Sequence, residues 1–134
     1  MNQKRRVLLV EDNESTIDIV ERQLECLGYH ATIAKTGLEA LEKLADEAPD
    51  LIIMDIQLPK MGGFEAVRQI RANPNLRDIP ILAATAKALK GDEENCLAAG
   101  CDGYIAKPFT HSQLQMAITA VFKRKLNNLP VNIE

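Results

Sequence analysis

The sequence predicts an α/β fold in which an open parallel sheet is covered by helices on both faces. Short apolar runs alternate five times with longer amphipathic stretches, which is the pattern of repeated strand–helix units. Two runs, residues 7–10 and 51–54, are unbroken apolar segments, typical of strands buried on both sides of a parallel sheet. Right-handed crossovers between parallel strands then place the helices on both faces.

Three further runs complete the five expected strands. They are residues 31–34, 81–84 and 103–106. Their apolar character is weaker than that of the first two runs, so we expect them nearer the edges of the sheet.

The first two helices are predicted by apolar residues that recur every three or four positions. The first is expected to stop at Gly28, and the second opens with a capping box of Thr36 and Glu39 and ends before Pro49. Their apolar stripes are Ile17, Val20, Leu24 and Leu27 in the first, and Leu38, Leu41 and Leu44 in the second.

The other three helices are marked by their starts and ends. The third follows the Gly62-Gly63 turn and finishes at Asn73-Pro74. The fourth, around residues 89–99, has the poorest apolar stripe, because polar residues occupy positions 92–95 in a row. The fifth opens with the capping pair Thr110 and Gln113. The apolar stripes are Phe64, Val67 and Ile70 in the third, and Leu114, Ile118, Val121 and Phe122 in the fifth.

Length and composition restrict the class of protein. A chain of 134 residues with 46% hydrophobic and 26% charged residues is expected to form one globular domain with its own core. The net charge of −3 favours neither nucleic acid nor a membrane as partner. The basic groups 4–6 and 123–125 lie far apart in sequence. The three cysteines have no close paired spacing, which favours a reducing, cytoplasmic location.

Polar residues follow the strands at the point where each strand ends. Glu11 and Asp12 follow the first strand, Asp55 the third, Thr85 the fourth and Lys107 the fifth. Because the carboxyl ends of parallel strands meet at one edge of the sheet, these residues are expected to converge. Three carboxylates would repel one another without a cation, and an all-oxygen set of ligands suits Mg²⁺.

Thr85 and Lys107 indicate which chemical group the site would bind. Thr85 offers a hydroxyl donor and Lys107 a positive charge, and both suit a phosphoryl group. An aspartate can be the nucleophile and form an acyl phosphate. The Lys107-Pro108 bond is also a candidate for a cis peptide. Together the residues predict metal-assisted phosphoryl transfer onto an aspartate, although each residue alone could simply end a strand or cap a loop.

Five segments at these positions carry a family resemblance. They are Val10-Glu11-Asp12-Asn13, Met54-Asp55-Ile56-Gln57-Leu58-Pro59, Gly62-Gly63, Ala84-Thr85-Ala86 and Lys107-Pro108-Phe109. Over about residues 5–125 the chain resembles the receiver domain of two-component response regulators, the CheY-like family. The resemblance implies a flavodoxin-like strand order 2-1-3-4-5. Because the short tail at 127–134 cannot supply an output domain, we expect a stand-alone receiver domain at residues 1–126 and no output domain.

The resemblance implies a role for each residue of the acidic edge. Asp55 would accept a phosphoryl group from a phosphohistidine of a sensor histidine kinase or a histidine phosphotransfer protein. Mg²⁺ would be bound by the side chains of Asp12 and Asp55, by Glu11 through a water molecule, and by the backbone carbonyl of Gln57. Gln57 and Lys87 flank the expected route of the hydrolytic water, so we hypothesise that they set the lifetime of the phosphoryl group.

The resemblance also implies a conformational switch. Thr85, the backbone amide of Ala86 and Lys107 would bind phosphoryl oxygens, and Tyr104 would swing inward as Thr85 moves. The fourth helix, fifth strand and fifth helix would then control a downstream effector protein. The chain is thus expected to be a cytoplasmic signalling protein, not an enzyme, that promotes its own phosphorylation and dephosphorylation. A monomer is expected, and dimerisation on activation is left open.

Three alternative functions fit the sequence less well. The first is an interaction module that keeps the receiver fold but works without phosphorylation, and the intact polar set counts against it. The second is a phosphatase of the haloacid-dehalogenase type, which carries an Asp-x-Asp pair after its first strand, whereas this chain has Asp-Ile-Gln after the third. The third, a dinucleotide-binding protein, lacks support because no glycine-rich loop follows the first strand.

Overall fold

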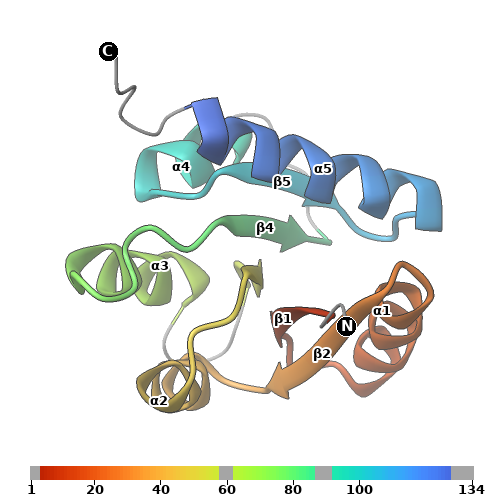
Figure 1. The fold of residues 1–134 in the computed structure, drawn as a ribbon, viewed down its shortest axis with the longest axis horizontal. Coiled ribbons are helices and arrows are strands. Elements are labelled where there is room, and N and C mark those ends of the chain that lie inside the picture. Colours follow the sequence, from red (N-terminus) through yellow and green to blue (C-terminus); the bar gives the residue numbers. More distant parts are fainter. Residues whose placement is uncertain (1–3, 58–61, 87–91, 128–134) are drawn as a thin grey trace.

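Five parallel strands form one sheet in a computed structural model that describes residues 4–57, 62–86 and 92–127 (Figure 1). The strands are β1 (Arg5–Val10), β2 (Tyr29–Ala34), β3 (Leu51–Asp55), β4 (Ile81–Thr85) and β5 (Gly103–Ala106). Their spatial order is β2-β1-β3-β4-β5, and every pairing is parallel. The predicted fold class and strand order are therefore confirmed.

Helices cover both faces of this sheet, with α1 on one side and α2 and α3 on the other (Figure 1). The helices are α1 (Glu14–Cys26), α2 (Gly37–Asp46), α3 (Gly63–Ala72), α4 (Asp92–Ala99) and α5 (His111–Asn127). Within the described residues, no helix is long and apolar enough to cross a bilayer.

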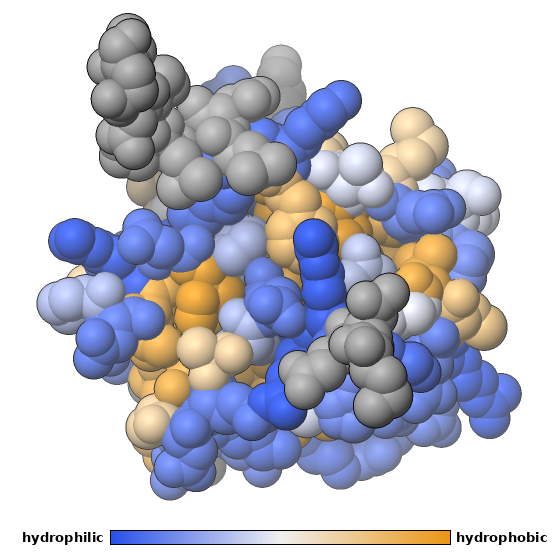
Figure 2. Space-filling view, in the orientation of Figure 1, coloured by the Kyte–Doolittle hydropathy of each residue, from blue (hydrophilic) through white to orange (hydrophobic). Residues whose placement is uncertain are grey.

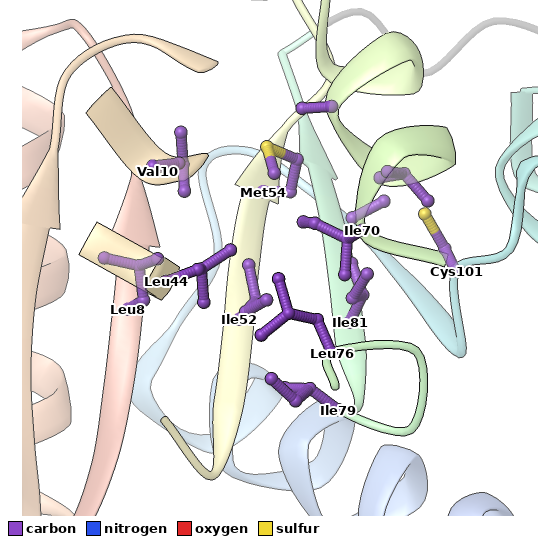
Figure 3. Close-up of a cluster of buried hydrophobic side chains, with 14 of the residues drawn as sticks. Leu8, Val10, Leu44, Ile52, Met54, Ile70, Leu76, Ile79, Ile81 and Cys101 are labelled. Carbon is purple, nitrogen blue, oxygen red and sulfur yellow. The ribbon is translucent and has the colours of Figure 1, made fainter. Parts of the chain in front are cut away.

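The core is divided by the sheet into two parts, because side chains alternate between the faces of a strand. One part joins the sheet to α2, α3 and α4 and includes Leu8, Ile52, Ile70 and Ile81 (Figure 3). The other joins the sheet to α1 and α5 and includes Leu24 and the buried face of α5.

The prediction about the weaker strands was partly wrong. β2 and β5 are the edge strands, as expected, but β4 lies inside the sheet and all its residues are buried. Ile81 and Ala83 pack in one part of the core, and Leu82 and Ala84 pack in the other. The small alanines lower the apolar signal of β4 while allowing helices to approach it from both sides.

Hydrogen bonds from capping side chains explain where α2 and α5 begin. Thr36 accepts a hydrogen bond from the Glu39 N–H (3.0 Å), although the Glu39 carboxylate accepts from the Lys35 N–H and not from Thr36 itself. The pair Thr110 and Gln113 forms the complete reciprocal capping box, at 3.0 and 2.8 Å. Thr36 therefore starts α2 as an N-cap without the expected reciprocal box, whereas the expected pair of Thr110 and Gln113 starts α5.

One predicted core position in α2 is wrong. Leu38 is 60% exposed, whereas Gly37, Ala40 and Leu44 form the buried face of the helix. The sequence pattern favoured the larger leucine, but the small residues Gly37 and Ala40 face the core instead.

The face of the molecule seen in Figure 2 is mainly hydrophilic, with smaller hydrophobic areas between the polar side chains. At the amino end of β1, the guanidinium carbon of Arg5 lies 4.6 Å from the ring centroid of Phe122 in α5. Arg5 of the first basic group therefore lies beside the residue that precedes the second basic group, 123–125.

Candidate functional site

Three carboxylates meet at the carboxyl edge of the sheet. Glu11, Asp12 and Asp55 each offer an oxygen atom, and these three atoms lie within 4.8 Å of one another. Glu11 and Asp55 are buried, and Asp12 is exposed. The convergence expected from the parallel sheet is thus present in the structure.

Strand pairing explains why residues so distant in sequence meet here. Val10 pairs with Met54, Asp55 with Ala84, and Thr85 with Ala106. The pairing continues beyond β1, because the N–H of Glu11 donates to the Ala34 carbonyl oxygen (2.9 Å). The strands therefore end in register, and the residues that follow them lie along one edge.

Lys107 supplies the positive charge of the site. Its Nζ donates to Glu11 Oε1 at 2.6 Å and lies 3.6 Å from Asp55 Oδ2. The Lys107 N–H donates to the Thr85 carbonyl oxygen (2.8 Å), and this bond aligns the end of β5 with β4. The Lys107-Pro108 peptide bond is cis, as expected. We call Glu11, Asp12, Asp55 and Lys107 the acidic cluster.

The charges of the acidic cluster do not balance, because three carboxylates share one ammonium group. Burial raises the pKa of Glu11 above its ordinary value, and the hydrogen bond from Lys107 opposes that rise. The negative charge of Asp55 raises the pKa of Glu11 further. An additional cation would relieve this unfavourable energy.

The turn after β3 is held tightly beneath the site. The N–H of Gln57 donates to Asp55 Oδ1 (2.9 Å), so one carboxylate oxygen is oriented by the backbone. Gly63, at the start of α3, packs directly on this turn. A Cβ atom at Gly63 would lie 2.4 Å from the Ile56 Cα and 2.5 Å from the Asp55 carbonyl oxygen. Only glycine allows this approach.

A cavity of about 540 Å³ opens above the acidic cluster. It is lined by the carboxylates and Lys107, by Gln57 and Ala86, and it extends along α1 to Phe109. Thr85 is fully buried at the end of β4, and the half-buried Tyr104 packs against the core beside α3 and α4. Lys87 lies outside the described residues.

Several residues that line this cavity have no functional role among the residues predicted from the sequence. Asn13 caps α1 by accepting from the Thr16 N–H (3.0 Å), and its own N–H donates to Glu11 Oε2 (3.2 Å). Thr16, Ile19 and Gln23 lie on one flank of α1, toward the cavity. Their three-to-four spacing behind the N-cap is a signal that could have indicated a second, less buried face of this helix.

The donor set of the acidic cluster fits a hard divalent cation. All the candidate ligands are oxygen atoms, and two of the three carboxylates are buried. Magnesium uses one or two carboxylates and retains several waters, and the exposed Asp12 and the open cavity leave room for such waters. Glu11, Asp12 and Asp55 are therefore the residues that could bind Mg²⁺.

Comparison with known proteins agrees with this geometry. Residues 7–119 match the model of the response regulator receiver domain. The polar-differentiation response regulator DivK of Brucella ovis is 42% identical over 106 residues, covering 79% of this chain and 86% of DivK.

Two solved structures also resemble this chain. The receiver domain of the sensor histidine kinase PA1611 from Pseudomonas aeruginosa has a TM-score of 0.79 and 44% identity, and covers 85% of this chain and 93% of that domain. That domain contains a magnesium ion coordinated in its active site cleft. Vibrio cholerae CheY4 has a TM-score of 0.83 and 32% identity, and covers 89% of this chain and 99% of CheY4. The chain is a response regulator protein of the receiver-domain family.

Proposed function

We propose that the chain is a phosphorylation-dependent switch in which Asp55 is the phosphoacceptor. The observation that carries this proposal is the acidic cluster, in which three carboxylates lie close together beneath an open cavity and two of them contact one lysine. The balance of charge favours a divalent cation and a phosphoryl group together, because each compensates the charge of the other. The proposed donor is a phosphohistidine of a sensor histidine kinase or of a phosphotransfer protein.

The transfer step is a displacement at phosphorus. One Asp55 carboxylate oxygen forms a bond to phosphorus, the bond from phosphorus to the imidazole nitrogen breaks, and the imidazole leaves with that electron pair. The Gln57 N–H orients Asp55 through Oδ1, which leaves Oδ2 toward Lys107. Mg²⁺, when bound, would neutralise the phosphoryl oxygens as the two anions approach each other.

The ligands that we propose for Mg²⁺ are Asp12 and Asp55 directly, Glu11 through water, and the Gln57 carbonyl oxygen. Their support is the all-oxygen donor set within 4.8 Å and the magnesium found in the similar PA1611 receiver domain. Glu11 Oε1 already accepts a hydrogen bond from Lys107 Nζ. Because that oxygen has a partner, an indirect role through a water molecule suits Glu11 better than direct binding.

The switch follows from contacts that exist only after phosphorylation. We propose that the Thr85 hydroxyl, the Ala86 N–H and Lys107 bind phosphoryl oxygens, and that Tyr104 moves inward with Thr85. Lys107 would then exchange part of its bond to Glu11 for a bond to the phosphoryl group. The surface of α4, β5 and α5 would transmit the change to an effector protein.

Intact mass measured after incubation with acetyl phosphate tests this function. We expect one phosphoryl adduct that requires Mg²⁺ and is absent from Asp55→Asn. Asp18→Asn, which removes an exposed carboxylate on α1, is the matched control and should still form the adduct. No adduct in the native chain under any condition would favour a receiver-fold module that works without phosphorylation.

The lifetime of the adduct tests two further residues. We propose that Gln57 and Lys87 limit the access of hydrolytic water to the phosphoryl group. Replacing both by alanine should change the dephosphorylation rate measured by the same mass assay. An unchanged rate contradicts this role.

A further inference from the structure

Gln23 in α1 contacts the segment that follows β5. Its Nε2 donates a hydrogen bond to the Phe109 carbonyl oxygen at 3.3 Å. A carbonyl oxygen can only accept, so the amide must direct Nε2 toward Phe109 and Oε1 away from it. Oε1 is buried and has no hydrogen-bond partner among the residues that the structure describes.

This arrangement is a poor way to stabilise a fold. A buried acceptor without a partner loses its bonds to water, and that loss offsets what a single hydrogen bond contributes. An unbranched apolar side chain of similar length would fill the same space without burying an unpaired oxygen. The net contribution of the Gln23 side chain to stability is therefore small, and its one hydrogen bond to the described residues is the bond to Phe109.

The segment that Gln23 contacts carries the lysine of the acidic cluster. Lys107 is tied to β4 by the bond from its N–H to the Thr85 carbonyl oxygen, and the Thr110 capping box starts α5. Between Lys107 and Thr110, the Phe109 carbonyl oxygen accepts the hydrogen bond from Gln23. α1 begins directly after Asp12 and Asn13, so the bond links the carboxylate side of the site to its lysine side.

Gln23 also lines the same cavity as Asp55 and Lys107. We propose that Gln23 is a positioning residue that, through Phe109, holds Lys107 at the distance from Asp55 that an incoming phosphoryl group requires. The inference rests on the proposed phosphorylation of Asp55 and adds a residue that does not touch the reacting atoms. Loss of the bond leaves the Mg²⁺ ligands in place but allows the segment around Lys107 to shift.

The test compares Gln23→Met with the native chain in three measurements. The rate of adduct formation with acetyl phosphate and saturating Mg²⁺ should fall about tenfold, as for other residues that orient a catalytic group. The Mg²⁺ dissociation constant, from calorimetry, should stay within about twofold, because no metal ligand moves. The urea unfolding midpoint should be unchanged or higher, because the variant no longer buries an unpaired oxygen. Acetyl phosphate needs no docking surface, so a lost partner contact cannot explain a slower rate.

Two further variants control the comparison. Gln69→Met removes an amide that donates to Glu65 Oε2, also at 3.3 Å, on the exposed face of α3, and should react at the native rate. Gln23→Lys keeps an N–H donor and should recover most of the lost rate.

The possible outcomes separate the inference from the function on which it rests. The inference is wrong if Gln23→Met reacts at the native rate. It is also wrong if the rate, the Mg²⁺ affinity and the unfolding midpoint all fall together, because that result indicates a structural role only. A native chain that forms no adduct instead contradicts the proposed phosphorylation and removes the reaction that Gln23 would serve.

Discussion

Two groups of charged side chains lie at opposite ends of the same sheet. The acidic cluster stands at the carboxyl ends of the strands, and a second group stands at the amino ends of β4 and β5. We call this second group, Arg71, Asp102 and Lys125, the Arg71 cluster. Apart from the exposed Asp12, both groups are largely buried, and both join residues from several elements, but their hydrogen bonds differ.

The Arg71 cluster is saturated with hydrogen bonds. The guanidinium of Arg71 donates to the carbonyl oxygens of Gly100, Arg77 and Ile79 and to Asp102 Oδ2, at 2.7 to 2.9 Å. Asp102 Oδ2 also accepts from the N–H of Ile81 (2.9 Å), and Lys125 lies 3.7 Å from Oδ1. The single carboxylate therefore has two cations and a backbone donor.

The acidic cluster, in contrast, has more carboxylates than cations. Three carboxylates share one lysine, and the cavity leaves room beside them. The comparison shows that burial of charge does not by itself identify a functional site. A buried group whose partners satisfy it holds elements together, whereas a buried group with an excess of one charge requires a ligand.

Removal of Arg71 should have the largest effect on stability. Arg71→Met leaves Asp102 buried without its main partner, so the free energy of unfolding should fall by about 3–5 kcal/mol. Mg²⁺ should not restore it, because no ligand replaces the guanidinium. Urea unfolding with and without Mg²⁺ measures both effects. Arg68→Met, on the exposed face of α3, is the matched control and should cost less than about 0.5 kcal/mol. A loss that Mg²⁺ reverses in Arg71→Met would contradict the distinction between the clusters.

Removal of Lys107 should have a smaller effect that depends on metal. Without Mg²⁺, Lys107→Met leaves Glu11 and Asp55 without their cation, and we expect a loss of about 1–3 kcal/mol. Mg²⁺ should recover most of this loss, because a ligand that binds only the folded state stabilises it. The same urea titrations give the result, with the exposed Lys35→Met as control. A loss that is equal with and without Mg²⁺ would indicate that this cluster, too, is purely structural.

Gly63, beside the acidic cluster, and Gly100, beside the Arg71 cluster, extend the comparison of the two clusters to the backbone. A Cβ at Gly63 would collide with backbone atoms of the Asp55 turn, and a Cβ at Gly100 would lie 2.8 Å from Arg71 Cγ at a φ of +118°. Both alanine variants should lose about 1–3 kcal/mol in urea unfolding. Only Gly63→Ala should also weaken Mg²⁺ binding in calorimetry, because it displaces Asp55. Equal Mg²⁺ affinities in the two variants would show that the Asp55 turn tolerates the shift.

The sequence predicted the acidic cluster but not the Arg71 cluster, for a physical reason. Glu11, Asp55 and Lys107 directly follow apolar runs, so the parallel sheet alone brings them together. Arg71 bonds mainly to backbone carbonyls in turns, and a sequence does not indicate where such carbonyls point. The same limit applies to Gln23, whose partner is the carbonyl of Phe109, 86 residues away.

Larger features of the fold were predictable to different degrees. Strand order followed from the family resemblance, and the capping pair of Thr110 and Gln113 from local spacing. The full burial of β4 and the exposure of Leu38 did not follow from apolar spacing, because both depend on how closely helices approach through small residues. Packing of this kind is decided by tertiary contacts and not by apolar spacing.

The smallest predicted effect concerns two cysteines beside the Arg71 cluster. Cys96 in the last turn of α4 and Cys101 before β5 are both buried, and the N–H of Cys101 donates to the Cys96 carbonyl oxygen (2.9 Å). With Gly100 at positive φ, this bond belongs to a Schellman motif, in which the residues at these two positions normally touch. Figure 3 shows Cys101 among the side chains of this part of the core. The hydrogen bond between Cys101 and Cys96 therefore ends α4.

Burial, followed by the neighbouring Cys96, raises the pKa of Cys101 from its ordinary 9.0 to about 12. The folded state thus favours the neutral thiol, so its contribution to stability is complete below pH 9.0 and is lost as the pH rises toward 12. At pH 8, iodoacetamide should modify the exposed Cys26 quickly and the two buried thiols only after unfolding in urea, as intact mass will report. Rapid triple modification of the native chain would show that α4 opens readily. In that case α4 would be an unstable helix directly beside the Arg71 cluster. The hydrogen bonds of Arg71 would then stabilise the chain as far as Gly100 but not α4, which precedes it.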